Sequence, residues 1–265
     1  MTVLRTETIP LPPADPALPA LGTALTGAAA GEVLAQSLLH PPDGSLELRS
    51  CRPCYVRYKP GTNCLVQYQL TLEDAGAGCA ENVLVHMKLY ADGRAGRLWA
   101  RGSLQRLARA AAEAQPQPPL GRVAYLPELQ ALVQVVPVDV ELPALAVATS
   151  DEGRRQALPR ALGRGASQLR EGAVELVRYK PARKALLRYG AAGEPVRVYA
   201  KLHTDERGAR VLAAEEALRE SGLAVAAALA YVPSLRMLVH AEAPGTPLGE
   251  LRGTSVFDRC AEAAG

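Results

Sequence analysis

The chain has 265 residues and a mass of 28.0 kDa, which is enough for about two domains of ordinary size. Its 30 lysines and arginines against 27 acidic residues leave a net charge of +3, which excludes a strongly basic or strongly acidic tail as the main feature. Aromatic residues make up only 4% of the chain, so no stacking platform for nucleic acid and no dedicated nucleic-acid surface are expected.

The sequence favours a cytoplasmic protein without a membrane partner. The apolar runs are shorter than the roughly 18 residues that a membrane-spanning helix needs. The first residues lack the basic start and apolar core of a signal peptide. Five cysteines, an odd number, indicate reduced thiols rather than a disulfide framework.

The chain contains two copies of one sequence unit, at residues 15–138 and 139–252, after an N-terminal extension at residues 1–14. The pentapeptide Val-Arg-Tyr-Lys-Pro occurs at 56–60 and again at 177–181. Four further matches keep the same order along both copies, at 15–21 and 139–145, 64–70 and 185–191, 86–90 and 199–203, and 125–133 and 231–239. Chance does not produce five ordered matches, so we interpret the chain as an internal duplication.

In chain order, each copy is predicted to begin with a short helix, at Ala30–Leu39 and at Gly153–Leu162. In the second copy, two strands at Val174–Tyr179 and Ala185–Tyr189 are joined by a turn at Pro181, which fixes φ and cannot donate to a ladder. A third strand, rich in β-branched and aromatic residues, follows at Val196–Leu202.

A helix is then predicted at Glu206–Glu220, ending near Gly222, with two more strands around Tyr231–Pro233 and at Leu235–Ala241. The first copy repeats this order with a helix at Ala95–Ala114. The sequence therefore predicts an α+β protein made of two tandem five-stranded antiparallel sheets with packed helices.

Four features of the second copy carry a family resemblance. They are the turn Lys180–Lys184, Lys201 on the third strand, Glu215 and Glu216 on the helix, and the stretch Leu238–Leu248, which contains a Pro-Gly-x-x-Leu exit. Their order and spacing resemble the N-terminal lobe of the aminoglycoside phosphotransferase and protein-kinase-like superfamily. The resemblance covers about 80 residues in each copy.

The resemblance implies a binding site for ATP with Mg²⁺. Lys201 would pair with the phosphates and be held by Glu215 or Glu216, which follow it by 14 and 15 residues. In the turn, Lys180, Arg183 and Lys184 would supply charge to the phosphates in place of a glycine-rich loop. The backbone from His240 to Glu242 would offer hinge hydrogen bonds to adenine.

Structural alternatives exist for each of these residues. Lys201 is alternatively a solvated lysine at the end of a strand. The two helix glutamates alternatively form an acidic face that pairs with Arg219. The matching arginines and tyrosines, such as Tyr58 and Tyr179, are interpreted as hairpin packing.

The first copy departs further from the pattern. It keeps Lys88 on its strand, but Gly102 and Ser103 stand where the second copy has the two glutamates. We therefore expect the first copy to be a degenerate, structural duplicate rather than a nucleotide site.

Phosphoryl transfer in this fold needs a second lobe with a catalytic Asp and metal-binding residues. None of the four histidines begins a His-x-Asp loop, and residues 253–265, with a predicted helix at Val256–Ala264, resemble only the start of such a lobe. We therefore expect the nucleotide-binding N-terminal region of a small-molecule phosphotransferase that is not catalytic alone. Its acceptor would be a hydroxyl-bearing small molecule bound by the absent lobe. The alternative is a non-catalytic scaffold or binding module.

Cys51 and Cys54 form a C-x-x-C pair, which is one half of many zinc sites. Cys64 and Cys79 do not supply a second pair at matching spacing. We therefore interpret the pair as small strand residues.

Overall fold

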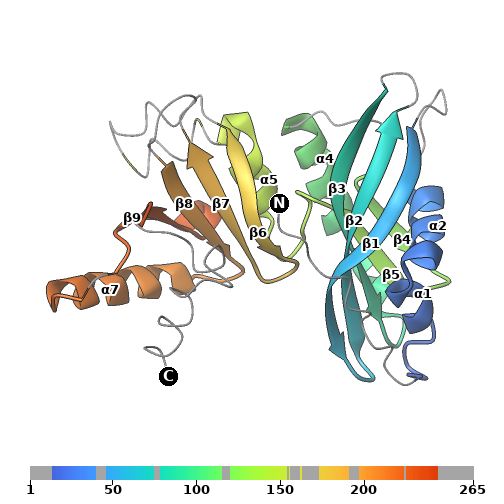
Figure 1. Cartoon of the computed structure of the whole chain (residues 1–265). Helices are drawn as coiled ribbons and strands as arrows, with labels where there is room; N and C mark the ends of the chain where they lie inside the picture. The colour runs from blue at the N-terminus through green and yellow to red at the C-terminus, as the bar shows by residue number, and fades with distance from the viewer. Residues whose placement is uncertain are drawn as a thin grey trace, which may run out of the picture.

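A computed structural model confirms the α+β architecture with two five-stranded antiparallel sheets (Figure 1). The structure describes residues 14–39, 46–74, 78–114, 120–153, 155, 162, 173–190, 197–223 and 225–243. Within these ranges, no helix is long and apolar enough to cross a membrane.

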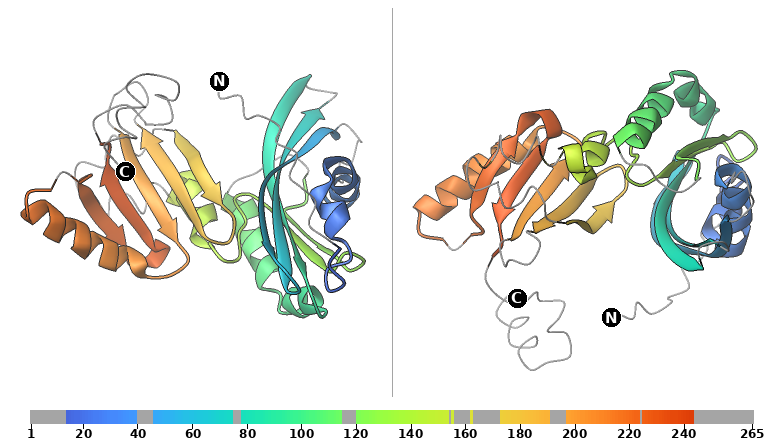
Figure 2. Two further views of the ribbon diagram at one scale, coloured as in Figure 1. Left: turned by 60° about the horizontal axis from the view of Figure 1, so that its bottom comes forward. Right: turned by 90° about the horizontal axis from the view of Figure 1, so that it is seen from above.

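In the first unit, helices and strands follow the chain order α1 (Leu21–Leu25), α2 (Gly27–Leu38), β1 (Leu46–Lys59), β2 (Asn63–Asp74), β3 (Cys79–Tyr90), α3 (Arg94–Ala100), α4 (Ser103–Ala114), β4 (Val123–Leu126) and β5 (Ala131–Val135). The strands lie in the spatial order β1-β2-β3-β5-β4. α1 and α2 cover one face of this sheet, and α3 and α4 lie on the other side (Figures 1 and 2).

The second unit has the elements α5 (Ala144–Thr149), β6 (Val174–Lys180), β7 (Lys184–Gly190), β8 (Arg197–His203), α7 (Arg207–Glu220), β9 (Ala228–Val232), the 3-10 turn η3 (Pro233–Leu235) and β10 (Met237–Ala241). Its strand order, β6-β7-β8-β10-β9, is the order of the first sheet. The duplicated sequence therefore folds into a duplicated topology.

The helices differ most from the sequence predictions. The helix expected at Ala95–Ala114 is two helices, because Gly102 has φ +69° and ends the α-helical path between α3 and α4. The helix expected at Ala30–Leu39 begins three residues earlier, as α2. The short helices α1 and α5 were not predicted. Most of the helix expected at Gly153–Leu162, and all of the one at Val256–Ala264, lie outside the described residues.

The residues that repeat in the sequence make the same hydrogen bonds in both units. In the first unit, the Tyr58 hydroxyl and the Gly61 N–H both donate to Asp15 Oδ2, each at 2.8 Å. In the second, the Tyr179 hydroxyl and the Ala182 N–H donate to Asp139 Oδ2 at 2.7 and 2.8 Å. Each aspartate thus ties the start of its unit to the first hairpin turn, which gives the repeated tyrosines a structural role.

A second pair of repeated tyrosines anchors one short helix to each sheet, α1 in the first unit and α5 in the second. Tyr68 and Tyr189 are buried, and their hydroxyls donate to the carbonyls of Ala24 and Ala148 at 2.6 and 2.8 Å. Burial of these rings supplies apolar contact, while the hydrogen bond satisfies the one polar atom that each ring carries.

Exchanging glycine and alanine in the two hairpin turns should change the free energy of unfolding in opposite directions. Gly61 and Ala182 both adopt left-handed backbone, with φ +65° and +56°, which costs a residue with a Cβ about 1 kcal/mol. We expect Ala182→Gly to raise the free energy of unfolding by up to about 1 kcal/mol and Gly61→Ala to lower it by a similar amount. Urea unfolding measures both changes. A loss of stability in Ala182→Gly would contradict the inference that the left-handed backbone of Ala182 is strained.

The second unit packs onto the inner face of the first sheet through its first residues. Ala146 is buried, and Val140 is partly buried, in one apolar cluster with Tyr90, Leu104 and Leu132 of the first unit. On the opposite side of α5, Leu145 and Ala148 belong to the core of the second sheet. α5 therefore lies between the two units and contacts both (Figure 2).

Candidate functional site

A basic pocket of about 460 Å³ lies where the turn between β6 and β7 approaches the first unit. We call it the basic pocket, and its lining residues are Arg57, Lys180, Ala182, Arg183, Lys184, Lys201, His203, Thr204, Arg207 and Val211. Four of the predicted site residues, Lys180, Arg183, Lys184 and Lys201, are among them. The volume falls within the usual range of small-molecule sites.

Sheet register explains why these cations converge. Lys184 is paired with Lys180 on β6 and with His203 on β8, and directly opposed residues point to the same face of a sheet. Lys201 is two residues before His203 on the same strand, so it shares that face. The N-terminus of α7 adds Arg207 to the pocket.

Like charges dominate the electrostatics of the basic pocket. The positive charge of Lys201, followed by partial burial and by Lys180, lowers the pKa of Lys184. Burial lowers the pKa of His203, and the nearby Lys201 and Arg207 lower it further. Such crowding of cations creates a strong local positive potential, which attracts anions.

Asp205, an acidic residue next to the lining residue Thr204, is already engaged by an arginine. Asp205 accepts hydrogen bonds from the Arg207 side chain, two at 2.7 Å, and from the Arg207 backbone N–H at 3.1 Å. These bonds lower the pKa of Asp205. No carboxylate lines the basic pocket within the part of the chain that the structure describes.

The ion pair expected between Lys201 and a helix glutamate does not form. Glu215 on α7 lies 2.8 Å from Nε2 of His240 on β10, and both side chains are largely buried. Glu216 points to solvent. Among the described residues, no carboxylate lies within ion-pair distance of Lys201.

The expected hinge residues lie apart from the basic pocket. His240 is held by Glu215, and the Tyr199 hydroxyl lies 3.4 Å from a carboxylate oxygen of Glu242. The N–H of Ala241 donates to the carbonyl of Ala227 at 2.9 Å, so sheet pairing uses one of the donors expected to face adenine.

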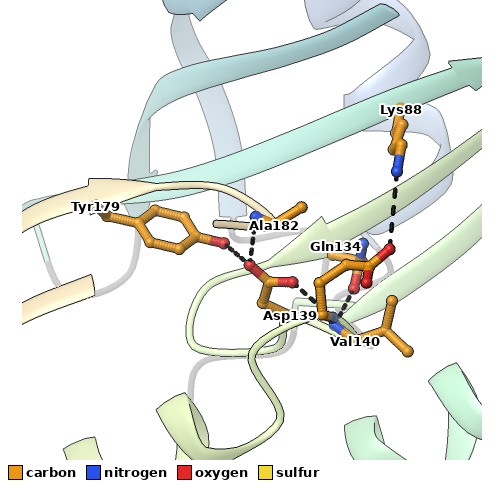
Figure 3. A network of polar contacts seen from close by, with 7 residues as sticks. Lys88, Gln134, Asp139, Val140, Tyr179 and Ala182 are labelled. Carbon is orange, nitrogen blue, oxygen red and sulfur yellow. Dashed lines mark hydrogen bonds and ion pairs between the residues drawn. The ribbon is translucent and has the colours of Figure 1, made fainter. Parts of the chain in front are cut away.

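In the first unit, the second unit fills the face that corresponds to the basic pocket. Lys88, the match of Lys201, lies 3.8 Å from a carboxylate oxygen of Glu141 (Figure 3). Its ammonium also lies 4.9 Å from the ring centre of Tyr90. Burial lowers the pKa of Lys88, with Glu141 opposing the shift. Gln134 accepts a hydrogen bond from the Val140 N–H at 2.8 Å. This face of the first unit is an intramolecular interface.

His86 is a buried histidine at this interface, and we expect it to make the protein acid-sensitive. Because Tyr179 donates its only proton to Asp139, the Nδ1–H of His86, 3.3 Å away, is the donor to the Tyr179 oxygen. Burial lowers the pKa of His86 below its ordinary 6.5; Asp139 opposes this shift, while Lys88 and Arg57 add to it.

The unfolded chain therefore binds a proton near pH 6.5 that the folded chain excludes. The free energy of unfolding should fall as the pH drops below about 6.5, by at most about 1.4 kcal/mol per pH unit for this group. Urea unfolding at pH 7.5 and 5.5 measures the change, and His86→Gln should reduce it. An identical pH dependence in the variant would exclude His86 as the cause.

Three ionisable lining residues were not predicted from the sequence: Arg57, His203 and Arg207. Arg57 and His203 lie inside repeated segments, but only the fold brings the first-unit arginine to the second unit.

Cys51 and Cys54 are free thiols on β1. Burial raises the pKa of Cys51 to about 12, and burial also raises the pKa of Cys54. Both are therefore strand residues in thiol form at neutral pH.

Comparisons with family models, with curated proteins and with solved structures give no match. The kinase-like resemblance consequently depends on the residues and geometry of this chain alone.

Proposed function

We propose that the second unit binds the phosphates of a nucleotide, as the N-terminal nucleotide-binding region of an ATP-dependent small-molecule phosphotransferase. One observation carries this proposal: six cationic side chains converge on the basic pocket, and four of them were predicted for this role. Catalysis would depend on a lobe that supplies the base, the metal ligands and the site for a hydroxyl-bearing acceptor. A cytoplasmic location agrees with the four free thiols of the described residues.

The residues of the basic pocket fit ATP better than they fit Mg²⁺. Lysine and arginine donors match phosphate oxygens in charge and geometry. Magnesium prefers oxygen ligands such as carboxylates, and the described lining offers none. The nearest acid, Asp205, is bound by Arg207.

Calorimetry with ATP tests the proposal. Lys201→Met should weaken ATP binding about tenfold, or about 1.4 kcal/mol, because a charge next to the phosphates is lost. Lys59→Met is the matched control, since Lys59 is the exposed first-unit match of Lys180 and does not line the basic pocket. Failure of the wild-type chain to bind ATP, with or without Mg²⁺, would refute the proposal.

A non-catalytic binding module is the second candidate. The observation that favours it is the pairing of Glu215 with His240, which leaves Lys201 without the partner that kinases use. Under this function, Lys201→Met would leave binding of a partner protein unchanged.

A further inference from the structure

The basic pocket is built by both units. Arg57 comes from β1 of the first unit, whereas the other cations come from the β6–β7 turn, β8 and α7 of the second. Figure 1 shows the β6–β7 turn directed toward the first sheet. The hydrogen bonds to Asp139 hold this turn in place.

Two buried nitrogen atoms of the lining have no partner. Nε of Arg57 and Nε2 of His203 are both shielded from solvent and make no hydrogen bond, and His203 as a whole is only 8% exposed. Buried polar atoms without partners are rare in folded proteins and reduce stability. Their presence in a polar pocket indicates a ligand that supplies the missing partner.

The charge of the lining indicates which ligand. Six cations and no carboxylate among the described lining residues repel a divalent cation and attract several negative charges. Resting on the proposed function, we infer that the basic pocket binds a chain of two or three phosphates without a divalent cation, and that arginines and lysines of both units neutralise it. The two units are thereby joined through the ligand.

Calorimetry with inorganic triphosphate and with ATP, each in EDTA and then in excess Mg²⁺, tests this inference. We expect both ligands to bind in EDTA and Mg²⁺ to weaken each at least fivefold. Arg57→Gln should weaken both at least fivefold, whereas the matched strand-end variant Lys59→Gln should change binding less than twofold. Circular dichroism shows whether each variant is folded.

A spectroscopic measurement keeps the test independent of the variants. Triphosphate should raise the pKa of His203 in an NMR titration of the wild-type chain, because the anion offsets the surrounding cations. The resonance of His240, which is held by Glu215 and does not line the basic pocket, is the internal reference.

The outcomes separate this inference from the proposed function. Tighter binding of MgATP than of free ATP would overturn the inference and support the phosphotransferase. Equal binding of triphosphate and ATP in EDTA would support the inference and remove the case for nucleotide recognition. Binding unaffected by Arg57→Gln would overturn the two-unit site, and absence of any phosphate binding would overturn both proposals.

Discussion

Asp139→Ala is expected to lower the free energy of unfolding by about 3 kcal/mol. Asp139 is completely buried between the units, and its Oδ2 accepts the Tyr179 hydroxyl and the Ala182 N–H. Hydrogen bonds to charged groups contribute about 1.5 to 3 kcal/mol, and a buried donor that loses its acceptor costs about 1 to 3 kcal/mol more. Urea unfolding of the intact chain measures the loss.

The duplication provides the control within the same molecule. Asp15 accepts the same pair of donors in the first unit but is partly exposed, so water can replace lost hydrogen bonds there. Asp15→Ala should therefore cost much less than Asp139→Ala, and Asp139→Asn, which keeps one acceptor oxygen, should be intermediate. Equal losses in the free energy of unfolding for Asp15→Ala and Asp139→Ala would show that burial of Asp139 does not determine its effect.

The strands of this fold were predictable because the repeat aligns them twice. The strand expected at Val196–Leu202 is β8, shifted by one residue, and the expected turn at Pro181 is the β6–β7 turn. Alternation of apolar and polar residues and the presence of turn residues are local properties, so strands and turns can be predicted from one chain segment. The short helices α1 and α5 escaped prediction because five or six residues carry too little periodicity.

The candidate site was only half predictable for a physical reason. The cations of the turn and of β8 are brought together by hairpin register, which follows from local pairing. The partner of Glu215 depends instead on how α7 packs over β10, and there His240 is the nearer group. Arg57 joins the basic pocket only through the packing of the two units, which no local pattern specifies.

Leu145→Ala is expected to destabilise both units together, by about 3 kcal/mol. Leu145 is fully buried in the core of the second sheet, and removal of such a side chain leaves a cavity. Its neighbour Ala146 belongs, together with Val138, to the apolar cluster on the inner face of the first sheet, which we call the inner cluster. Unfolding of the second unit would expose that cluster to water, so the two units should unfold in one transition.

The single tryptophan makes this coupling measurable. Trp99 on α3 packs against the inner cluster and stacks on Tyr125, with ring centres 6.1 Å apart, so its fluorescence reports on the first unit. Leu34→Ala, in an equally buried position of α2, lowers the urea midpoint of the Trp99 signal whether or not the units are coupled. Leu145→Ala lowers that midpoint only if unfolding of the second unit destabilises the first unit. An unchanged Trp99 midpoint in Leu145→Ala, with a lowered midpoint by circular dichroism, would show two independent units and an α5 that contacts the first without supporting it.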